Sequence, residues 1–185
     1  MGHPRDILAE KAMAAVKESS TALPRHPFPA AMSASDHAAL VETLAPDVVL
    51  HPAVSTTPFE GRETVAEVYA SVIESFDYIE VVDEFTTGDT LAFFWRGRID
   101  GRFVEGADRL RFDRDGKVRE ITVIGRPLSG VSTFLTTIGP RFARRRRGGL
   151  VAALLRLAAM PLPPLFSLLD PVTRWMTRPR ARPKG

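Results

Sequence analysis

The strongest constraint on the fold is a pair of alternating segments joined by the dipeptide Asp100-Gly101. Residues 91–99 carry apolar side chains at odd-numbered positions, and residues 103–113 carry them at even-numbered positions. A period of two is typical of strands with one buried face, and Asp-Gly is a strong signal for a two-residue hairpin turn. The segments therefore predict an antiparallel hairpin in which Ile99 pairs with Arg102.

Asp108 is the only charged residue at the inward positions of the second strand. The predicted pairing places it opposite Phe93, and it places Trp95 opposite Gly106; opposed residues point to the same side of a sheet. A slip of one residue would turn both apolar faces outward. Because an ionised carboxylate among aromatic rings costs several kcal/mol, we expect a raised pKa for Asp108. A role in ligand chemistry and a structural role, as a backbone cap or an arginine partner, both remain open.

The remaining segments predict an α+β domain, with helices first and an antiparallel meander after them. The clearest helix is 62–76, whose apolar positions recur every three or four residues. Further helices are expected at 5–19 and 35–45, with a proline-rich linker at Leu23–Pro29. Strands are expected at 47–52, 78–86, 90–99, 102–113 and 117–126.

Composition excludes several classes of protein. The 185 residues are 44% apolar and contain no cysteine, which excludes disulfide scaffolds, thiolate metal sites and cysteine nucleophiles. Charges near the N-terminus, at Arg5, Asp6, Glu10 and Lys11, argue against a secretory signal. No stretch of about 18 residues is free of charge and proline, so no ordinary membrane-spanning helix is expected. We expect a cytoplasmic protein, with a peripheral position at the inner membrane surface as one possibility.

The charge is divided sharply along the chain. Residues 1–140 hold 14 basic and 21 acidic residues, whereas residues 141–185 hold 11 basic residues and one acidic residue. The basic segment predicts apolar helices over 150–158, near Leu165 and after Asp170-Pro171, interrupted by prolines. They either lie on an anionic membrane surface, or cover the open mouth of the fold, the outer face of the sheet or a dimer partner. Nucleic acid is an unlikely partner, since no reading motif is present.

Residues 27–129 resemble the nuclear-transport-factor-2-like superfamily, in particular its SnoaL-like and ketosteroid-isomerase-like branch. The resemblance is carried by "APDVVLHP", "PFEGRETVAEVY", "VEGADRLRFDRDGKV" and "TVIGRPLSG". It implies a cone, in which a curved antiparallel sheet wraps around the N-terminal helices, with an apolar pocket at the open end. It also implies a homodimer. The expected organisation is an N-terminal helix and linker at 1–26, the SnoaL-like domain at 27–129 and a helical basic extension at 130–185.

The resemblance assigns two catalytic candidates. His51, before Pro52, occupies the position of the branch's catalytic base, and Asp108 occupies that of a protonated aspartate that donates to an oxyanion. The branch's tyrosine donor has its nearest match in Phe28, which carries no hydroxyl. A neutral histidine is a base near pH 7, so the pair suits proton transfer on an apolar substrate. The alternative for His51 is a strand-end residue that binds backbone or water.

Two functions follow as expectations. The first is a small-molecule protein, possibly an isomerase, cyclase or hydratase, that needs no metal or other cofactor. The second is a non-catalytic ligand-binding or assembly module attached to a membrane or partner through its basic helices. For either function, the residues expected to contact the apolar ligand are Phe28, Tyr69, Phe93, Trp95, Leu110 and Val123. Tyr69 has core packing as its alternative role.

Overall fold

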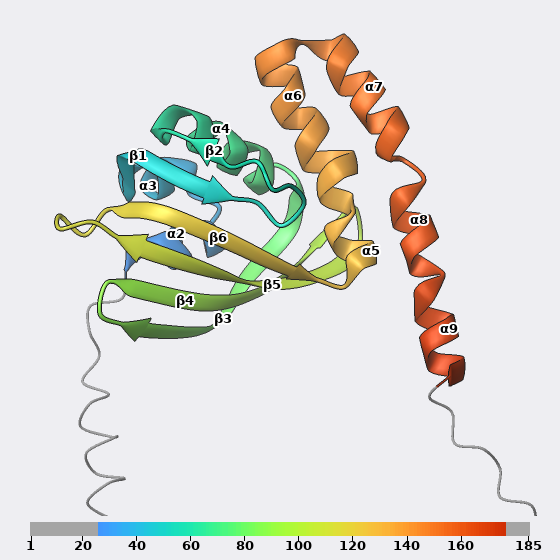
Figure 1. The fold of residues 1–185 in the computed structure, drawn as a ribbon, viewed down its shortest axis with the longest axis horizontal. Helices are drawn as coiled ribbons and strands as arrows, with labels where there is room; N and C mark the ends of the chain where they lie inside the picture. The colour runs from blue at the N-terminus through green and yellow to red at the C-terminus, as the bar shows by residue number, and fades with distance from the viewer. Residues whose placement is uncertain (1–25, 177–185) are drawn as a thin grey trace, which may run out of the picture.

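The computed structural model describes residues 26–176, which form an α+β domain followed by a helical extension (Figure 1). Helices α2 (Pro27–Ser33) and α3 (His37–Glu42) precede the first strand in the chain, and α4 (Arg62–Ile73) lies between the second and third strands. The strands are β1 (Leu44–His51), β2 (Phe59–Glu60), β3 (Phe76–Thr87), β4 (Thr90–Ile99), β5 (Arg102–Phe112) and β6 (Val118–Arg126). The predicted helix 5–19 lies outside the described residues.

The six strands form one mixed sheet in the order β2-β1-β6-β5-β4-β3. Strand β1 runs parallel to β6, and every other neighbouring pair is antiparallel. The predicted hairpin register is confirmed, with Ile99 opposite Arg102 and Phe93 opposite Asp108. Asp100 and Gly101 both have positive φ angles, of 50° and 72°, which is the geometry that a tight two-residue turn requires.

The core lies between the concave face of the sheet and helices α2, α3 and α4, around which the strands curve (Figure 1). Its largest fully buried side chains come from both layers: Phe28 and Met32 on α2, Leu40 on α3, Val65 on α4, and Phe93, Ile99, Leu110 and Ile121 on the strands. Helices packed on one face of a curved sheet confirm the predicted α+β cone. The prediction that the sheet is antiparallel throughout is wrong, because β1 runs parallel to β6.

The prediction of a linker over Leu23–Pro29 is wrong at its C-terminal end, because α2 begins at Pro27. Proline is tolerated in the first turn of a helix, where its missing N–H has no intrahelical partner. His26 caps this turn by accepting a hydrogen bond from the backbone N–H of Phe28 at 3.3 Å. Helix 62–76 was predicted three residues too long, since α4 ends at Ile73 and β3 begins at Phe76.

Strand β3 is an edge of the sheet, and it contains two register irregularities, one of them between Val81 and Asp83. Near this bulge the backbone N–H of Val81 donates to the Ser33 hydroxyl of α2 at 3.2 Å. The outward positions of β3 include the acidic residues Asp77, Glu80 and Asp83. One edge of the cone is therefore bent, partly hydrogen-bonded and negatively charged.

After β6 the chain forms a second, purely helical part. Its elements are α5 (Leu128–Val131), η1 (Phe134–Ile138), α6 (Gly139–Arg147), α7 (Gly149–Ala159), α8 (Leu162–Ser167) and α9 (Leu169–Met176). Figure 1 shows α6 standing beside one end of the cone and α7, α8 and α9 returning end to end along its far side. We call residues 149–176 the arm. The break that the prolines predict after residue 158 is confirmed, since α7 ends at Ala159.

One helical run among the described residues, Gly149–Ser167, is long and apolar enough to cross a membrane by length and composition alone. Its mean hydropathy is 1.6, and 17% of it is buried inside the protein. This run contains Arg156 and the prolines at 161, 163 and 164. A charge and prolines of this kind were the reason that the sequence predicted no ordinary membrane-spanning helix.

Candidate functional site

A partly enclosed cavity of about 320 Å³ lies between the sheet, α4 and the helices that follow β6. This volume is at the lower end of the range for pockets that hold small organic molecules. Its lining is largely apolar, and the side chains with polar atoms in it are Ser55, Tyr69, Trp95 and Asp108. The cavity therefore suits an apolar molecule that carries one polar group.

Asp108 lies in this cavity with only 3% of its surface exposed. It projects from β5 toward the core, as the alternation of the strand predicts. The indole Nε1–H of Trp95 donates a hydrogen bond to its Oδ1 at 2.8 Å. Within the described residues this is the only hydrogen bond of the Asp108 side chain, so Oδ2 is the oxygen left without a partner.

The Trp95–Asp108 contact depends on a glycine. Gly106 lies opposite Trp95 on β5, and a Cβ there would come within 2.5 Å of the indole ring and 2.3 Å of the Ile124 carbonyl. The missing side chain leaves room for the indole to lie across β5 and reach the carboxyl group two residues away. Phe76 packs edge-on against Trp95, with ring centroids 5.8 Å apart, and fixes its other side.

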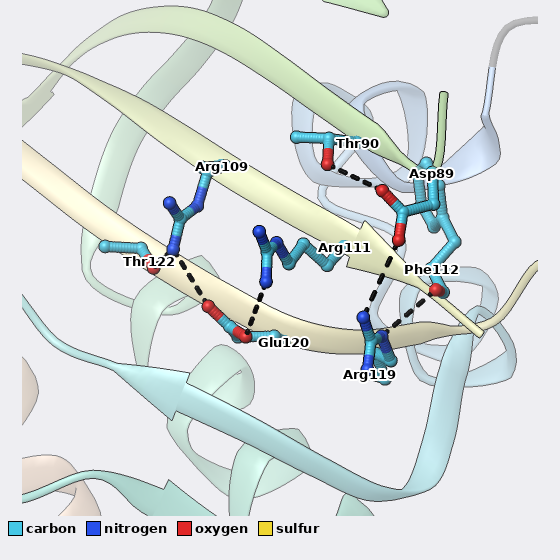
Figure 2. Close-up of polar contacts among 8 residues, drawn as sticks. All are labelled: Asp89, Thr90, Arg109, Arg111, Phe112, Arg119, Glu120 and Thr122. Atoms are coloured by element: carbon cyan, nitrogen blue, oxygen red, sulfur yellow. Dashed lines mark hydrogen bonds and ion pairs between the residues drawn. The ribbon is translucent and has the colours of Figure 1, made fainter. Parts of the chain in front are cut away.

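The neighbouring arginines on β5 lie on the opposite face of the sheet from Asp108. Figure 2 shows Arg109 and Arg111 both directed to Glu120 on β6. Arg109 donates to Glu120 at 2.9 Å and to the Thr122 hydroxyl at 3.2 Å. The structural alternative in which an internal arginine neutralises Asp108 is therefore not realised in the described residues.

Burial raises the pKa of Asp108 to about 7, and the hydrogen bond from Trp95 opposes this rise. The desolvated carboxylate is costly because apolar surroundings replace water, and one donor offsets only part of that cost. The predicted rise is confirmed. The proton is therefore held to a much higher pH than on an ordinary aspartate.

Tyr69 lines the same cavity, and its hydroxyl oxygen is closed off from solvent. It projects from α4, is almost fully buried, and its hydroxyl has no hydrogen-bond partner among the described residues. Burial and the charge of Asp108 both raise the tyrosine pKa well above its ordinary value, so the hydroxyl keeps its proton. An unpaired buried hydroxyl costs about 1–3 kcal/mol, which a bound ligand or water can recover. Tyr69 therefore combines core packing with a free donor.

His51 is not part of the cavity. It ends β1 as an exposed residue, because Val48 and Leu50 take the inward positions of that strand and the next residue points outward. The expectation that His51 and Asp108 share one cavity is wrong in this structure. Side chains alternate along β1, so a residue that follows an inward Leu50 points outward, whatever the family motif has at that position.

The predicted ligand contacts divide evenly. Tyr69, Trp95 and Val123 line the cavity. Phe28, Phe93 and Leu110 do not; they are fully buried in the core behind it. Phe28 packs edge-on against the Tyr69 ring with centroids 5.3 Å apart, so it positions the hydroxyl without contacting a ligand.

Sequence reasoning missed the part of the lining that comes from the C-terminal helices. These residues are Phe134, Leu135, Ile138, Gly139, Phe142, Ala143 and Leu155. The helices η1, α6 and α7 therefore cover part of the cone's mouth, which was one alternative for the extension. An apolar spacing at residues 134, 135, 138 and 142 was the available signal. In residues 26–176 no group of three or more histidine, aspartate or glutamate side chains is placed to hold a metal ion.

Solved structures with this fold come from several proteins. A steroid delta-isomerase from Pseudomonas aeruginosa shares 24% identity at a TM-score of 0.56, over 66% of this chain and 88% of that one. An uncharacterized protein with a cystatin-like fold from Silicibacter pomeroyi shares 22% identity at 0.56, over 65% and 86%. A de novo designed protein with a curved β-sheet shares 17% at 0.50, over 65% and 98%. At these identities the likeness shows the fold alone.

No curated protein matches the chain. Residues 26–121, just over half of the chain, match the SnoaL-like domain family. This range contains the helices α2–α4, the strands β1–β5 and Asp108. The chain therefore belongs to the SnoaL-like domain family, of the nuclear-transport-factor-2-like superfamily.

Proposed function

We propose that the cone binds an apolar small molecule that carries a carbonyl group, and that Asp108 moves a proton on it. The observation that supports this most is a carboxyl group with a pKa of about 7 that shares an apolar cavity with an unpartnered hydroxyl. A general base is most effective when its pKa lies near the working pH. Perturbed carboxyl groups in cavities are frequent at catalytic sites.

The proposed reaction is a proton shift. Oδ2 of ionised Asp108 takes a proton from the carbon next to the carbonyl, and the electrons of that C–H bond form an enolate. The Tyr69 hydroxyl donates a hydrogen bond to the enolate oxygen as its charge develops. Asp108 then returns the proton to another carbon of the conjugated system. The product is an isomer, so the reaction needs no oxidant or reductant, and Asp108 ends as it began.

Trp95 acts as a positioning residue in this scheme. Its Nε1–H occupies Oδ1 and favours the ionised form of Asp108, which keeps the pKa from rising further. The steroid delta-isomerase that shares the fold catalyses an isomerisation by its name, and this agrees with the proposed class of reaction.

A panel of β,γ-unsaturated ketones tests the proposal, with formation of the conjugated enone followed by ultraviolet absorbance. Asp108→Asn should abolish turnover, and Tyr69→Phe should lower kcat about 100-fold, as loss of one oxyanion donor does in other enzymes. Asp83→Asn, which removes an exposed carboxyl group from β3, is the matched control and should keep full activity. His51→Ala should keep it too; a large loss there would restore His51 as the base.

A non-catalytic binding protein is the second candidate, favoured by the absence of a titratable side chain other than Tyr69 and Asp108 in the cavity lining. Fluorescence of 2-naphthol separates the two. If the wild type and Asp108→Asn both bind 2-naphthol, and no ketone in the panel is isomerised by the wild type, the cone is a binding site only.

A further inference from the structure

Helix α7 turns its small residues toward the protein and its large apolar residues toward solvent, the opposite of an ordinary surface helix. Its buried residues are the small Ala152 and Ala159, 8% and 7% exposed, which lie one heptad apart on one face. Its large residues Leu150, Leu154 and Leu157 lie on the opposite face, with Leu157 68% exposed. Soluble helices normally turn their large apolar side chains toward the core. Here the contact with the protein uses methyl groups, and the leucines remain in solvent.

The rest of the arm continues this surface. Its exposed large apolar residues are Met160, Leu165, Leu168, Val172, Trp175 and Met176. The arm is nevertheless fixed to the cone, because Pro163 is buried and Arg102 on β5 donates to the Ser167 hydroxyl at 3.0 Å. An apolar surface held in place over α7, α8 and α9 is larger than scattered exposed residues and marks an interaction site.

Two arginines without a side-chain partner among the described residues lie between α6 and α7, on the other face of α7 from the exposed leucines. A polar cleft of about 510 Å³ between α6 and α7 is lined by Arg141, Arg144 and Arg156, with Thr136 and Asp100. The side chains of Arg144 and Arg156 make no hydrogen bond or ion pair within the part of the chain that the structure describes. Arg145 and Arg146, by contrast, are held by Glu74 and Glu67 of α4. The arginine run is thus divided between pairs with the cone and free cations at the cleft.

We propose that the arm docks on the surface of an anionic lipid bilayer. Leu150, Leu154 and Leu157 enter the boundary of the acyl chains, and the positive charge of residues 141–185 attracts the anionic headgroups. Basic residues beside an inserted apolar helix face are the usual composition of such surfaces.

Charge favours a bilayer over a second copy of the chain as the occupant. Residues 141–185, which are the arm with its flanking segments, contain 11 basic residues and one acidic residue, so two copies in contact along this whole segment would bring like charges together. Anionic headgroups supply the opposite charge instead.

Docking on the surface also fits better than crossing. The run Gly149–Ser167 is long enough to span, yet Arg156 lies near its middle. Ala152, Ala159 and Pro163 are packed against the protein, so crossing would detach the arm from the cone.

The arm reaches the cavity through one residue. Leu155 of α7 lines the cavity and is 42% exposed. The arm therefore contributes to the pocket of the proposed function through this residue. The docking proposal itself does not depend on that function, and Asp108→Asn should bind vesicles as the wild type does.

Sedimentation with vesicles of phosphatidylcholine and phosphatidylglycerol tests the proposal with two matched pairs. Arg156→Gln should weaken binding about five-fold, since each basic residue near anionic lipid contributes about that factor. Arg114→Gln, the same charge change in the β5–β6 turn, should not. Leu157→Ser should weaken binding roughly ten-fold or more, whereas Ile124→Ser, 65% exposed on β6, should have no effect.

Fluorescence supplies a local readout, because Trp175 in α9 is exposed and Trp95 is buried. Vesicles should shift the emission to the blue in the wild type and not in Trp175→Phe. High salt should release the protein, since it screens exposed charges.

Three results would overturn the proposal. The first is recovery of the protein entirely in the supernatant. The second is retention of the protein in the vesicles at high salt and alkaline pH, as a spanning helix shows. The third is a dimer, seen by light scattering, that Leu157→Ser dissociates without any effect of vesicles.

Discussion

The cone and the arm treat large apolar side chains in opposite ways. In the cone, Phe28, Phe93 and Leu110 are fully buried, and the outward positions of the strands carry charges. In the arm, Leu150 and Leu157 face solvent, and alanines make the contact with the protein. The cone has a closed apolar core, although Phe85, Phe94 and Ile124 are exposed on its strands. The arm has no such core of its own, and its exposed leucines form a surface that only another phase or molecule can cover.

Their charges differ in the same sense. Arginines on the outer face of the sheet are paired with nearby carboxylates, as in Arg96–Glu80, Arg109–Glu120 and Arg126–Glu105. Arg144 and Arg156, at the base of the arm, have no such partner in residues 26–176. The paired arginines of the sheet help to maintain the fold. Arg144 and Arg156 are available to bind another molecule.

The largest test of this contrast is a pair of truncations. Phe93→Ala should lower the free energy of unfolding by about 3–5 kcal/mol, because it removes a fully buried ring from the core. Leu154→Ala in the arm should change it by less than about 0.5 kcal/mol, since the side chain is already in water. Denaturation in urea measures both. Equal losses would mean that the arm is part of the cooperative core.

The next test is the pH dependence that the cone's buried acid imposes. The unfolded chain releases the Asp108 proton near pH 3.8, whereas the folded protein retains it to about pH 7. The folded state binds the extra proton between those values, so this contribution to stability is complete in acid and is lost as the pH rises through 7.

From about pH 4 to pH 8 the loss should reach about 4 kcal/mol at most. Asp108→Asn removes it, and its stability should exceed that of the wild type most at the alkaline end. Urea denaturation of both proteins across this range gives the difference. Parallel curves would show that the carboxyl group is hydrated in solution.

A smaller effect should follow from filling the space beside Trp95. Gly106→Ala places a Cβ against the indole ring and a backbone carbonyl, which should cost about 1–3 kcal/mol. It should also break the hydrogen bond to Asp108, so Trp95 fluorescence should change together with activity. Gly149→Ala, where a Cβ meets nothing within 4 Å, is the control at the start of the arm.

The smallest effect concerns the junction between the two regions. Arg146 on α6 donates to Glu67 on α4 at 2.5 Å, and both side chains are about one-third exposed. Glu67→Gln should cost about 0.5 kcal/mol globally, as partly exposed ion pairs do. Hydrogen exchange should nevertheless accelerate in α6 alone. Unchanged exchange there would mean that apolar contacts hold α6 without help from this pair.

Sequence reasoning succeeded where the determinants are local. The Asp100-Gly101 turn and the alternation on both sides of it fix the register, and the register places Asp108 beside Phe93. The burial of Asp108 and its raised pKa follow from that placement.

The rest depends on contacts between distant segments. Helix α6 contains four consecutive arginines and little apolar pattern, and its partners Glu67 and Glu74 lie more than 70 residues earlier in the chain. That the Tyr69 hydroxyl has no partner is likewise a property of the assembled cavity. His51 was misplaced because a motif position was carried over against the parity of β1.

The bent, acidic edge of the cone at β3 has a consequence for solubility. An open strand edge exposes unused backbone donors and acceptors, and it readily recruits a matching strand from another molecule. Here Asp77, Glu80 and Asp83 would face the same charges on an incoming copy, and the irregularity after Val81 disturbs the straight ladder that such recruitment needs. The charges and the irregularity therefore disfavour the pairing of β3 with a strand of another molecule, and with it aggregation through this edge of the sheet.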